Sequence, residues 1–478
     1  MFKAIRALAL LSPLAFLLAQ TGGADSPFLE KPYLQLGNAP HLSSSESLEL
    51  LWHTTDQPGN WGVELKTSKD SAWRAMDKPA TTSINAPGIP SHLVYRTLLK
   101  GLVPGEDFQY RVLKSGDMVF TSSGRARKSA GQPYRVVVFG DCAQGTPESR
   151  AVAYQTSLAK PDFVLIPGDI VYGSGRISEY REKFFPVYNS ETASPQTGAP
   201  LIRSIPFIAA VGNHDAALTN FQRYADALAF FLYWDEPLNG FVPSANSRAA
   251  VHRLTGNEEA QPPFLAAAGS RYPLMANFSF EYGNAHWLIL DSNTYMDWTN
   301  QELRDWIAKD LAGAQNATWR FVAFHHPGFN SAKEHSTDQW MRTLAPVFEA
   351  GKVDIVFQGH VHNYQRSYPF TFTPKPQADG AAVGPKGEVA GDWNFDKSFK
   401  DGGNTRPQGV IYIVSGAGGA GLYSVGMQKE PSTWQPFTYK FVSEEHSMSV
   451  LDISGKNFKL KQISDSGQQV DAFQIVKQ

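Results

Sequence analysis

The stretch Pro167-Gly168-Asp169-Ile170-Val171-Tyr172 decides the fold of this chain. It follows Asp162-Phe163-Val164-Leu165-Ile166, an apolar run that predicts a buried strand. Gly168 allows a tight turn, after which an aspartate and a tyrosine are presented three residues apart. The pattern predicts a strand that ends in a polar turn.

The same pattern of an apolar strand followed by polar residues recurs elsewhere in the chain. Those strands are expected over 135–139, 207–211, 321–324 and 354–358. Sheets of the α/β class bind ligands at the carboxyl ends of their strands, so these side chains should meet at one edge. The polar residues at the strand ends are Asp141, Asp169, Tyr172, Asn213, His214, Asp215, His325, His326, His360 and His362.

The composition of this set indicates a metal centre. Carboxylate, phenol, amide and imidazole groups without a set of thiolates suit iron, zinc or manganese. One ion needs only three or four such ligands, so the set predicts two metal ions about 3.5–4 Å apart. His326 follows a predicted ligand and is expected to have a structural role, as is Cys142.

The region from Tyr134 onward alternates strands with helical stretches, which predicts an α/β layered core. Helices are expected over 147–159, from a capping box at Thr299 onward, and over about 338–350. Two long interruptions, 219–273 and 371–408, are expected to be loops that shape the site. The glycine-rich segment 415–421 lacks the P-loop lysine, so we expect it to line the rim of the site.

The N-terminal third has a different character. Residues 28–127 contain short alternating runs with turn signals between them, which predicts a small all-β sandwich. Residues 122–132 are expected to be a linker. Residues 1–24 have a basic start and an uncharged apolar run, the pattern of a secretory signal with cleavage after Ala19 or Ala24.

Composition narrows the function further. The net charge of −2 and pI near 6.6 give no reason to expect nucleic acid as a stable partner. Cys142 is the single cysteine, so an internal disulfide is excluded. An exported, disulfide-free chain without a transmembrane anchor suggests a secreted or periplasmic bacterial protein, and its oligomeric state is not predictable.

The strand-end clusters resemble the sequence blocks of the purple acid phosphatases, within the calcineurin-like phosphoesterase superfamily. The match rests on Gly168-Asp169-Ile170-Val171-Tyr172, Gly212-Asn213-His214-Asp215, Val322-Ala323-Phe324-His325 and Gly359-His360-Val361-His362, which occur in the order of the family. The resemblance implies a catalytic domain over 134–478, with a central β-sandwich flanked by helices (αββα). The region 28–127 is similar to a fibronectin type III module that precedes the catalytic domain in this family.

The resemblance also implies the roles of individual residues. It assigns Fe(III) to Asp141, Asp169, Tyr172 and His362. It assigns a divalent ion (Zn, Fe or Mn) to Asp169, Asn213, His325 and His360, so that Asp169 bridges the two ions. His214 and His335 would bind phosphate or protonate the leaving group, and Asp215 would orient His214.

Three residues depart from the pattern of the family. Ala143 stands where a glycine is usual, Glu334 replaces a histidine before His335, and Gln365 replaces a glutamate beside Arg366. Metal binding is still expected despite these departures. What they affect is how the site handles its substrate.

The function implied is that of a secreted acid phosphatase that hydrolyses small phosphate monoesters, with a metal-activated hydroxide attacking phosphorus in line. The alternatives are a phosphodiesterase or nucleotide hydrolase on the same site, and a non-catalytic envelope binding protein. In the nucleotide case, the aromatic residues 230–234 would stack a base, although a packing role is equally expected.

Overall fold

The computed structural model describes residues 26–478 apart from 218–219, 245–251 and 402–405. The expected signal segment, residues 1–24, lies outside the described residues. No helix in the described part of the chain is long and apolar enough to cross a membrane.

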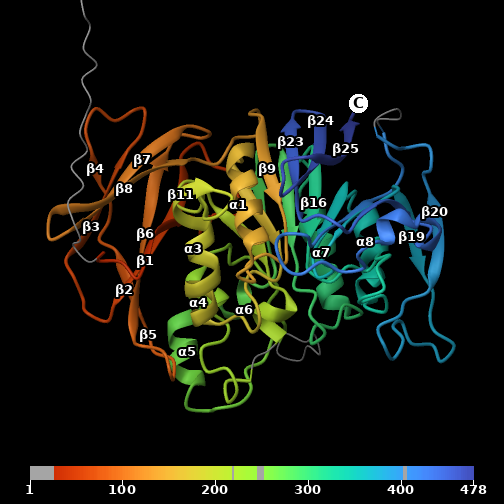
Figure 1. The fold of residues 1–478 in the computed structure, drawn as a ribbon, viewed down its shortest axis with the longest axis horizontal. Helices are drawn as coiled ribbons and strands as arrows, with labels where there is room; N and C mark the ends of the chain where they lie inside the picture. Colours follow the sequence, from red (N-terminus) through yellow and green to blue (C-terminus); the bar gives the residue numbers. More distant parts are fainter. Residues whose placement is uncertain (1–25, 218–219, 245–251, 402–405) are drawn as a thin grey trace, which may run out of the picture.

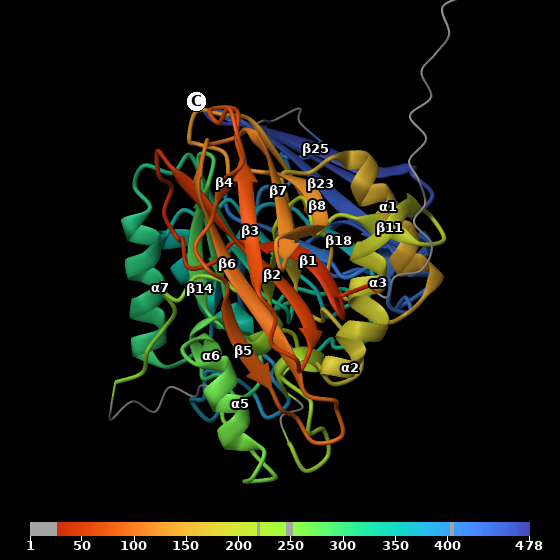
Figure 2. The ribbon, with the colours of Figure 1, turned by 90° about the vertical axis from the view of Figure 1, so that its left-hand side faces the viewer.

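The N-terminal part consists of two four-stranded antiparallel sheets, which confirms the all-β prediction (Figure 2). Trp52 and Tyr95 from one sheet and Val63 and Tyr110 from the other are buried in one shared core. The first sheet, in the order β1-β2-β6-β5, contains β1 (Glu30–Gln35), β2 (Glu46–Thr55), β5 (Ala80–Ile84) and β6 (His92–Leu102). The second, in the order β4-β3-β7-β8, contains β3 (Trp61–Lys66), β4 (Arg74–Ala75), β7 (Asp107–Lys114) and β8 (Asp117–Arg125).

The prediction of a linker over 122–132 is wrong for the first half of that range. Strand β8 continues through Arg125, and the side chain of Arg127 is 2% exposed. Arg127 pairs with Glu46 at 2.7 Å and donates hydrogen bonds to the carbonyls of Ala39 and Glu281. A buried, paired guanidinium fixes the chain where the two parts of the molecule meet.

The remainder of the chain forms two stacked sheets with helices on both outer faces, which confirms the predicted αββα class (Figure 1). One sheet has the order β13-β10-β9-β23-β24-β25 and the other β14-β15-β16-β17-β21-β18-β22. The first comprises β9 (Tyr134–Val138), β10 (Phe163–Pro167), β13 (Phe207–Ala210), β23 (Ser447–Ser454), β24 (Asn457–Ser464) and β25 (Gln469–Val476). The second comprises β14 (Phe278–Tyr282), β15 (Ala285–Ile289), β16 (Trp319–Ala323), β17 (Ile355–Gln358), β18 (Tyr364–Ser367), β21 (Ile411–Ser415) and β22 (Thr438–Val442).

Alternation along the strands explains this layering. In β10, Phe163 and Leu165 face the core between the two sheets, whereas Val164 and Ile166 face a separate core on the outer side. Helix α1 (Pro147–Ala159) packs on that outer face, and α7 (Gln301–Gly313) and α8 (Ala345–Ala350) lie over the other sheet (Figure 1). Apolar runs buried on both faces therefore specify central strands.

Several expected elements differ in detail. Helix α7 is capped by the Asn300 side chain, which accepts from the amides of Glu302 and Leu303, and not by Thr299. The helix expected over 338–350 is divided into a 3-10 helix, Trp340–Leu344, and α8. The expected loop 371–408 contains a strand pair, β19 (Phe370–Pro374) and β20 (Gly391–Phe395). A second strand pair, β11 (Asn189–Ser194) and β12 (Gly198–Pro200), lies near α1.

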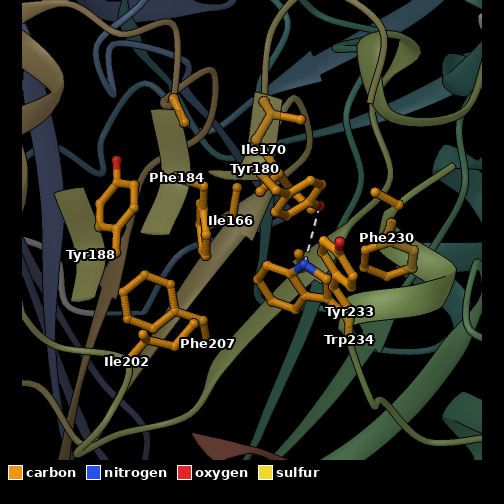
Figure 3. Close-up of a cluster of buried hydrophobic side chains, with 14 of the residues drawn as sticks. Ile166, Ile170, Tyr180, Phe184, Tyr188, Ile202, Phe207, Phe230, Tyr233 and Trp234 are labelled. Carbon is orange, nitrogen blue, oxygen red and sulfur yellow. Dashed lines mark hydrogen bonds between the residues drawn. The ribbon is translucent and has the colours of Figure 1, made fainter. Parts of the chain in front are cut away.

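The aromatic residues 230–234 are packed in the core and are not available to stack a base (Figure 3). They form α4 (Phe230–Tyr233) and Trp234, whose Nε1 donates to the Tyr180 hydroxyl at 3.1 Å. Phe230, Tyr233 and Trp234 are all buried. Neighbouring short helices are α2 (Ile177–Glu179), α3 (Phe185–Tyr188), α5 (Gln261–Ala268) and α6 (Arg271–Leu274).

Buried histidines connect the N-terminal sheet to this aromatic segment. His92 Nε2 accepts from the Tyr233 hydroxyl at 2.8 Å, while His92 Nδ1 lies 3.3 Å from the Pro90 carbonyl. His53 Nε2 lies 2.8 Å from the Tyr33 hydroxyl. Burial, together with the charge of Arg181, lowers the pKa of His92 to about 4.

This low pKa predicts a loss of stability in acid. With an unfolded pKa near 6.5, the unfolded chain binds more protons between pH 6.5 and 4, so stability falls as the pH decreases through that range. His92→Gln removes one such group, and its free energy of unfolding should fall about 3 kcal/mol less than that of the wild type between pH 7 and 4. Denaturant unfolding at each pH measures this difference. Equal slopes for His92→Gln and the wild type would contradict the assignment.

Candidate metal centre

The predicted metal ligands meet at the carboxyl edge of the two sheets. In a first group, the Tyr172 hydroxyl donates to Asp141 Oδ1 at 3.0 Å and lies 3.0 Å from His362 Nε2. His362 Nε2 is also 3.4 Å from Asp141 Oδ1. All three side chains are buried, and they come from the loops after β9, β10 and β17. A phenol, a carboxyl group and an imidazole thus face one point.

A second group lies beside the first. His325 Nε2 is 3.0 Å from Asn213 Oδ1, 3.2 Å from His360 Nδ1 and 3.3 Å from Asp169 Oδ1. One oxygen of Asp141, one of Asp169 and one nitrogen of His325 all lie within 4.8 Å of one another. Both carboxylates therefore lie where the two groups meet, and the assignment of Asp169 as the bridge stays a prediction.

The backbone conformation helps to position these ligands. Asp141, Asp169 and His360 have φ values of 58°, 50° and 67°, in the left-handed region that non-glycine residues rarely adopt. Such strained residues cluster at functional sites, where the surrounding structure holds them. At Gly212, an added Cβ would lie 2.1 Å from Asp169 Oδ1, so only glycine allows this approach.

The electrostatics couple the carboxylates to the imidazoles. Burial acts to raise the pKa of Asp169, but the charges of His325 and His214 outweigh it and hold that pKa low. Burial acts to lower the pKa of His325, but Asp169 raises it to about 9. His360 differs, because burial lowers its pKa to about 4. In the absence of an ion, the site therefore favours a charged Asp169–His325 pair.

Among the predicted catalytic residues, Asp215 has a different contact from the one expected. His214 Nδ1 lies 2.8 Å from the Gly173 carbonyl, and its Nε2 lies 3.9 Å from Asp169 Oδ2. The Asp215 carboxyl accepts from the backbone amides of Gly212 at 2.8 Å and Ile170 at 3.1 Å. Asp215 thus ties together the loops that carry Asp169 and Asn213, and the expectation that it orients His214 is wrong.

His335 is held by a residue that the sequence analysis does not identify. Asp338 Oδ2 lies 3.0 Å from His335 Nδ1 and 3.3 Å from His360 Nε2. The two histidine contacts outweigh the effect of burial and lower the pKa of Asp338 to about 2, so it is an anion. The three-residue spacing of His335 and Asp338 is the sequence feature that could identify Asp338, although both residues lie outside the strand-end blocks.

The glycine-rich segment 415–421 supports the first group, as expected of a segment at the rim. The amide of Ala420 donates to the Asp141 carbonyl at 2.9 Å, and the Gly421 carbonyl lies 2.7 Å from His362 Nδ1. The segment also delivers Tyr423, whose ring stacks on His362 with centroids 4.0 Å apart. Sequence analysis does not identify Tyr423, because no pattern links it to His362.

The three departures from the family pattern make structural contacts, whereas His326 lies close enough to His325 and His360 to share a metal ion with them, so its structural role stays a prediction. His326 Nδ1 lies 2.9 Å from the Ser292 hydroxyl, and its ring lies 4.3 Å from that of His360. Ala143 is buried and pairs with Val171, so Asp141 keeps its place without a glycine. Glu334 accepts from the Ser424 hydroxyl. Gln365 Nε2 donates to the side-chain carbonyls of Asn330 and Asn363, as a carboxylate cannot.

A cleft of about 880 Å³ opens beside the second group. Asn213, His335, Asp338 and His360 line its inner end, and segments 294–299 and 381–387 line the rest. Segment 381–387 belongs to the second of the two interruptions, as expected. Among the residues of 219–273 that the structure describes, none lines this cleft, so the expectation for the first interruption stays a prediction.

The donor set fits a dinuclear centre. Buried carboxylates, imidazoles, an amide and a phenol converge from separate loops, and a buried acidic cluster of this kind is satisfied by cations. Two stacked sheets between helices, with such a set at their shared edge, are the arrangement expected of a metallophosphoesterase.

Comparison with known proteins agrees with this class. Residues 134–364 match the calcineurin-like phosphoesterase family model. An uncharacterized protein of Mycobacterium tuberculosis is 24% identical over 379 residues, which cover 73% of this chain and 64% of that protein. Purple acid phosphatase 18 of Arabidopsis thaliana is 26% identical over 330 residues, which cover 68% of this chain and 64% of that protein.

The fold comparison points the same way. The structure of a purple acid phosphatase from yellow lupin (Lupinus luteus) superposes with a TM-score of 0.61 at 19% identity, covering 93% of this chain and 74% of that one. Residues 134–364 are therefore similar to a calcineurin-like phosphoesterase domain, and the chain has the fold of a purple acid phosphatase. The match spans 64% of the length of each of the two relatives above, and another relative in Arabidopsis thaliana is named a probable inactive purple acid phosphatase.

Proposed function

We propose that the protein is a secreted acid phosphatase that hydrolyses small phosphate monoesters at a dinuclear metal centre. Asp141, Asp169, Tyr172 and His362 would hold Fe(III), and Asp169, Asn213, His325 and His360 would hold a divalent ion (Zn, Fe or Mn). The observation that carries the proposal is the position of Asp169, with one oxygen within 4.8 Å of ligand atoms from both Asp141 and His325. When bound, the two ions would supply an activated water nucleophile for in-line attack on phosphorus and stabilise the added charge.

The side chains around the ligands would handle the substrate. His335 is half-buried in the cleft, and Asp338 holds its Nδ1 at 3.0 Å, which directs Nε2 away from that carboxylate. In this position the imidazole would donate to a phosphoryl oxygen or pass a proton to the leaving alkoxide. His214, partly exposed beside Asp169, would bind a second phosphoryl oxygen.

Two alternatives remain as outcomes of the test. A phosphodiesterase or nucleotide hydrolase would use the same ligands, but residues 230–234 do not support it because they are buried. A non-catalytic binding protein would need no complete ligand set, and the short distances between the proposed ligands support the enzyme instead.

The proposal is tested by metal analysis and by rates on matched esters. We expect two metal ions per chain and a kcat/KM for 4-nitrophenyl phosphate at least about tenfold above that for its bis-ester at mildly acidic pH, about 1.4 kcal/mol of discrimination. Chelation should abolish both rates, and restoring the metals should recover them. Preference for the bis-ester would establish a phosphodiesterase, and two bound metals without hydrolysis of either ester would establish a binding protein.

A further inference from the structure

One wall of the cleft belongs to a projecting hairpin, which we call the hairpin arm and define as residues 370–395. Strands β19 and β20 form its base, and Figure 1 shows it at the end of the molecule opposite β1–β8. Residues 381–387, in the connection between its strands, line the cleft that begins at Asn213 and His360. The arm therefore reaches from the surface to the candidate metal centre.

The connection is fixed in place against the 3-10 helix Trp340–Leu344. Arg342, 8% exposed, donates from Nη1 to the Val389 carbonyl at 3.0 Å. The amide of Val389 donates to Gln339 Oε1 at 3.0 Å, and the amide of Gln339 donates to the Gly387 carbonyl at 3.1 Å. Gly387 has a φ of 97°, and a Cβ there would lie 2.7 Å from the Thr337 carbonyl. These contacts make this wall a fixed part of the site.

Trp340 provides an aromatic surface in the cleft, next to this wall. Its ring lies 5.1 Å from that of His326, and it is half-buried. Its Nε1 donates to the Ser292 carbonyl at 2.9 Å, which fixes the orientation of the indole. A ring that is already oriented loses little entropy when a ligand stacks on it. Val383 and Pro385 of the arm add apolar surface to the same cleft.

The charged groups of the cleft are largely occupied. Asp297 accepts from the Thr299 amide and hydroxyl, and Asp338 contacts His335 and His360. Lys386 lies at the exposed rim. Next to the candidate metal centre, aromatic and aliphatic surface is therefore what remains for recognition of the part of a substrate beyond its phosphate.

We infer that this cleft binds the alcohol portion of the substrate and selects phosphate monoesters of aromatic alcohols. Trp340 is the stacking surface, and segment 381–387 of the hairpin arm determines specificity. This inference rests on the proposed function, because it places the phosphate at the inner end of the cleft beside Asn213 and His360. The volume of about 880 Å³ accommodates an aryl or heteroaryl group.

Binding of non-hydrolysable phosphonates to the metal-loaded protein tests the inference. By calorimetry, the wild type should bind phenylphosphonate at least about tenfold more tightly than methylphosphonate, within the range of stacking on an aromatic side chain. Trp340→Ala should reduce this ratio to about threefold or less, and Trp340→Phe should retain most of it. Val383→Ala, on the surface of the arm, should reduce the ratio by about a factor of three without endangering the fold.

The control is Lys375→Ala, on the same arm in an exposed pair with Asp392 and outside the cleft lining, which should leave the ratio unchanged. The inference is overturned if the wild type binds both phosphonates equally or binds neither, or if Trp340→Ala and Val383→Ala both leave the ratio intact. A wild type that shows the ratio but hydrolyses no monoester would contradict the proposed function and still support the cleft assignment.

Discussion

Asp169→Asn is expected to remove both metal ions from the purified protein and to lower phosphatase kcat/KM by more than the ~10²–10³-fold that loss of one electrostatic donor costs. Asp169 Oδ1 lies 3.3 Å from His325 Nε2, and one oxygen of this carboxylate lies within 4.8 Å of ligand atoms of both Asp141 and His325. An amide removes the negative charge and one of the oxygens available for coordination. Metal analysis and steady-state kinetics on the same preparation measure the two effects.

Asp162→Asn is the matched control for this experiment. Asp162 precedes β10 and Asp169 follows it, so the two carboxylates flank one strand. Asp162 is buried and accepts from the Arg135 amide at 2.8 Å, far from the ligand edge. This variant should lose some stability and keep both metals. An Asp169→Asn protein that retains two metals and full activity would show that another group bridges them.

Tyr172→Phe is expected to abolish the visible colour of the iron-loaded protein without preventing it from folding. The Tyr172 ring is 5% exposed, and its hydroxyl lies 3.0 Å from both Asp141 Oδ1 and His362 Nε2. Burial and then Asp141 raise the pKa of this phenol well above 10, so a strongly acidic cation is required to ionise it. A ferric phenolate absorbs visible light, whereas phenylalanine supplies no oxygen to iron. The absorption spectrum, normalised to iron content, measures the change.

Tyr423→Phe controls for a nearby phenol that is not a proposed ligand. Its ring stacks on His362 at 4.0 Å, so it lies in the same surroundings. This variant should keep the colour. If Tyr423→Phe bleaches the protein and Tyr172→Phe does not, the ferric site is assigned to the wrong tyrosine. A colourless wild type with full iron would contradict the proposed ferric site at Tyr172.

The ligand groups are predictable from sequence because each follows a strand that is apolar on both faces. Phe163 to Ile166 can be recognised as a central strand without a structure, and the turn at Gly168 then places Asp169 at its carboxyl end. Parallel strands end at one edge of a sheet, so the residues that follow separate strands come together there although they are far apart in the sequence. The α/β layered core follows from the same strands and from the helices between them, whereas the αββα arrangement is what the family resemblance implies.

Residues outside those strands are not predictable in this way. Asp338 meets His360 because the chain turns at His335, where φ is 56°, and no local pattern specifies this turn. Tyr423 reaches His362 through the glycine-rich segment. The glycines and prolines of the hairpin arm predict a loop and give no signal of its two short strands. The pairing of these strands depends on the aromatic contact between Phe372 and Trp393. These positions depend on tertiary contacts that override local propensity.

The pairing of β9 with β23 has a consequence for how the protein is made. Residues 134–138 bond in register to residues 449–453, so the sheet that carries Asp141 and Asp169 lacks an inner strand until the end of the chain is available. Contacts of such high sequence separation form slowly and after synthesis of nearly the whole polypeptide. We therefore expect a ribosome-bound chain to lack the complete sheet that supports the candidate metal centre. Release of the last strands is the event that completes it.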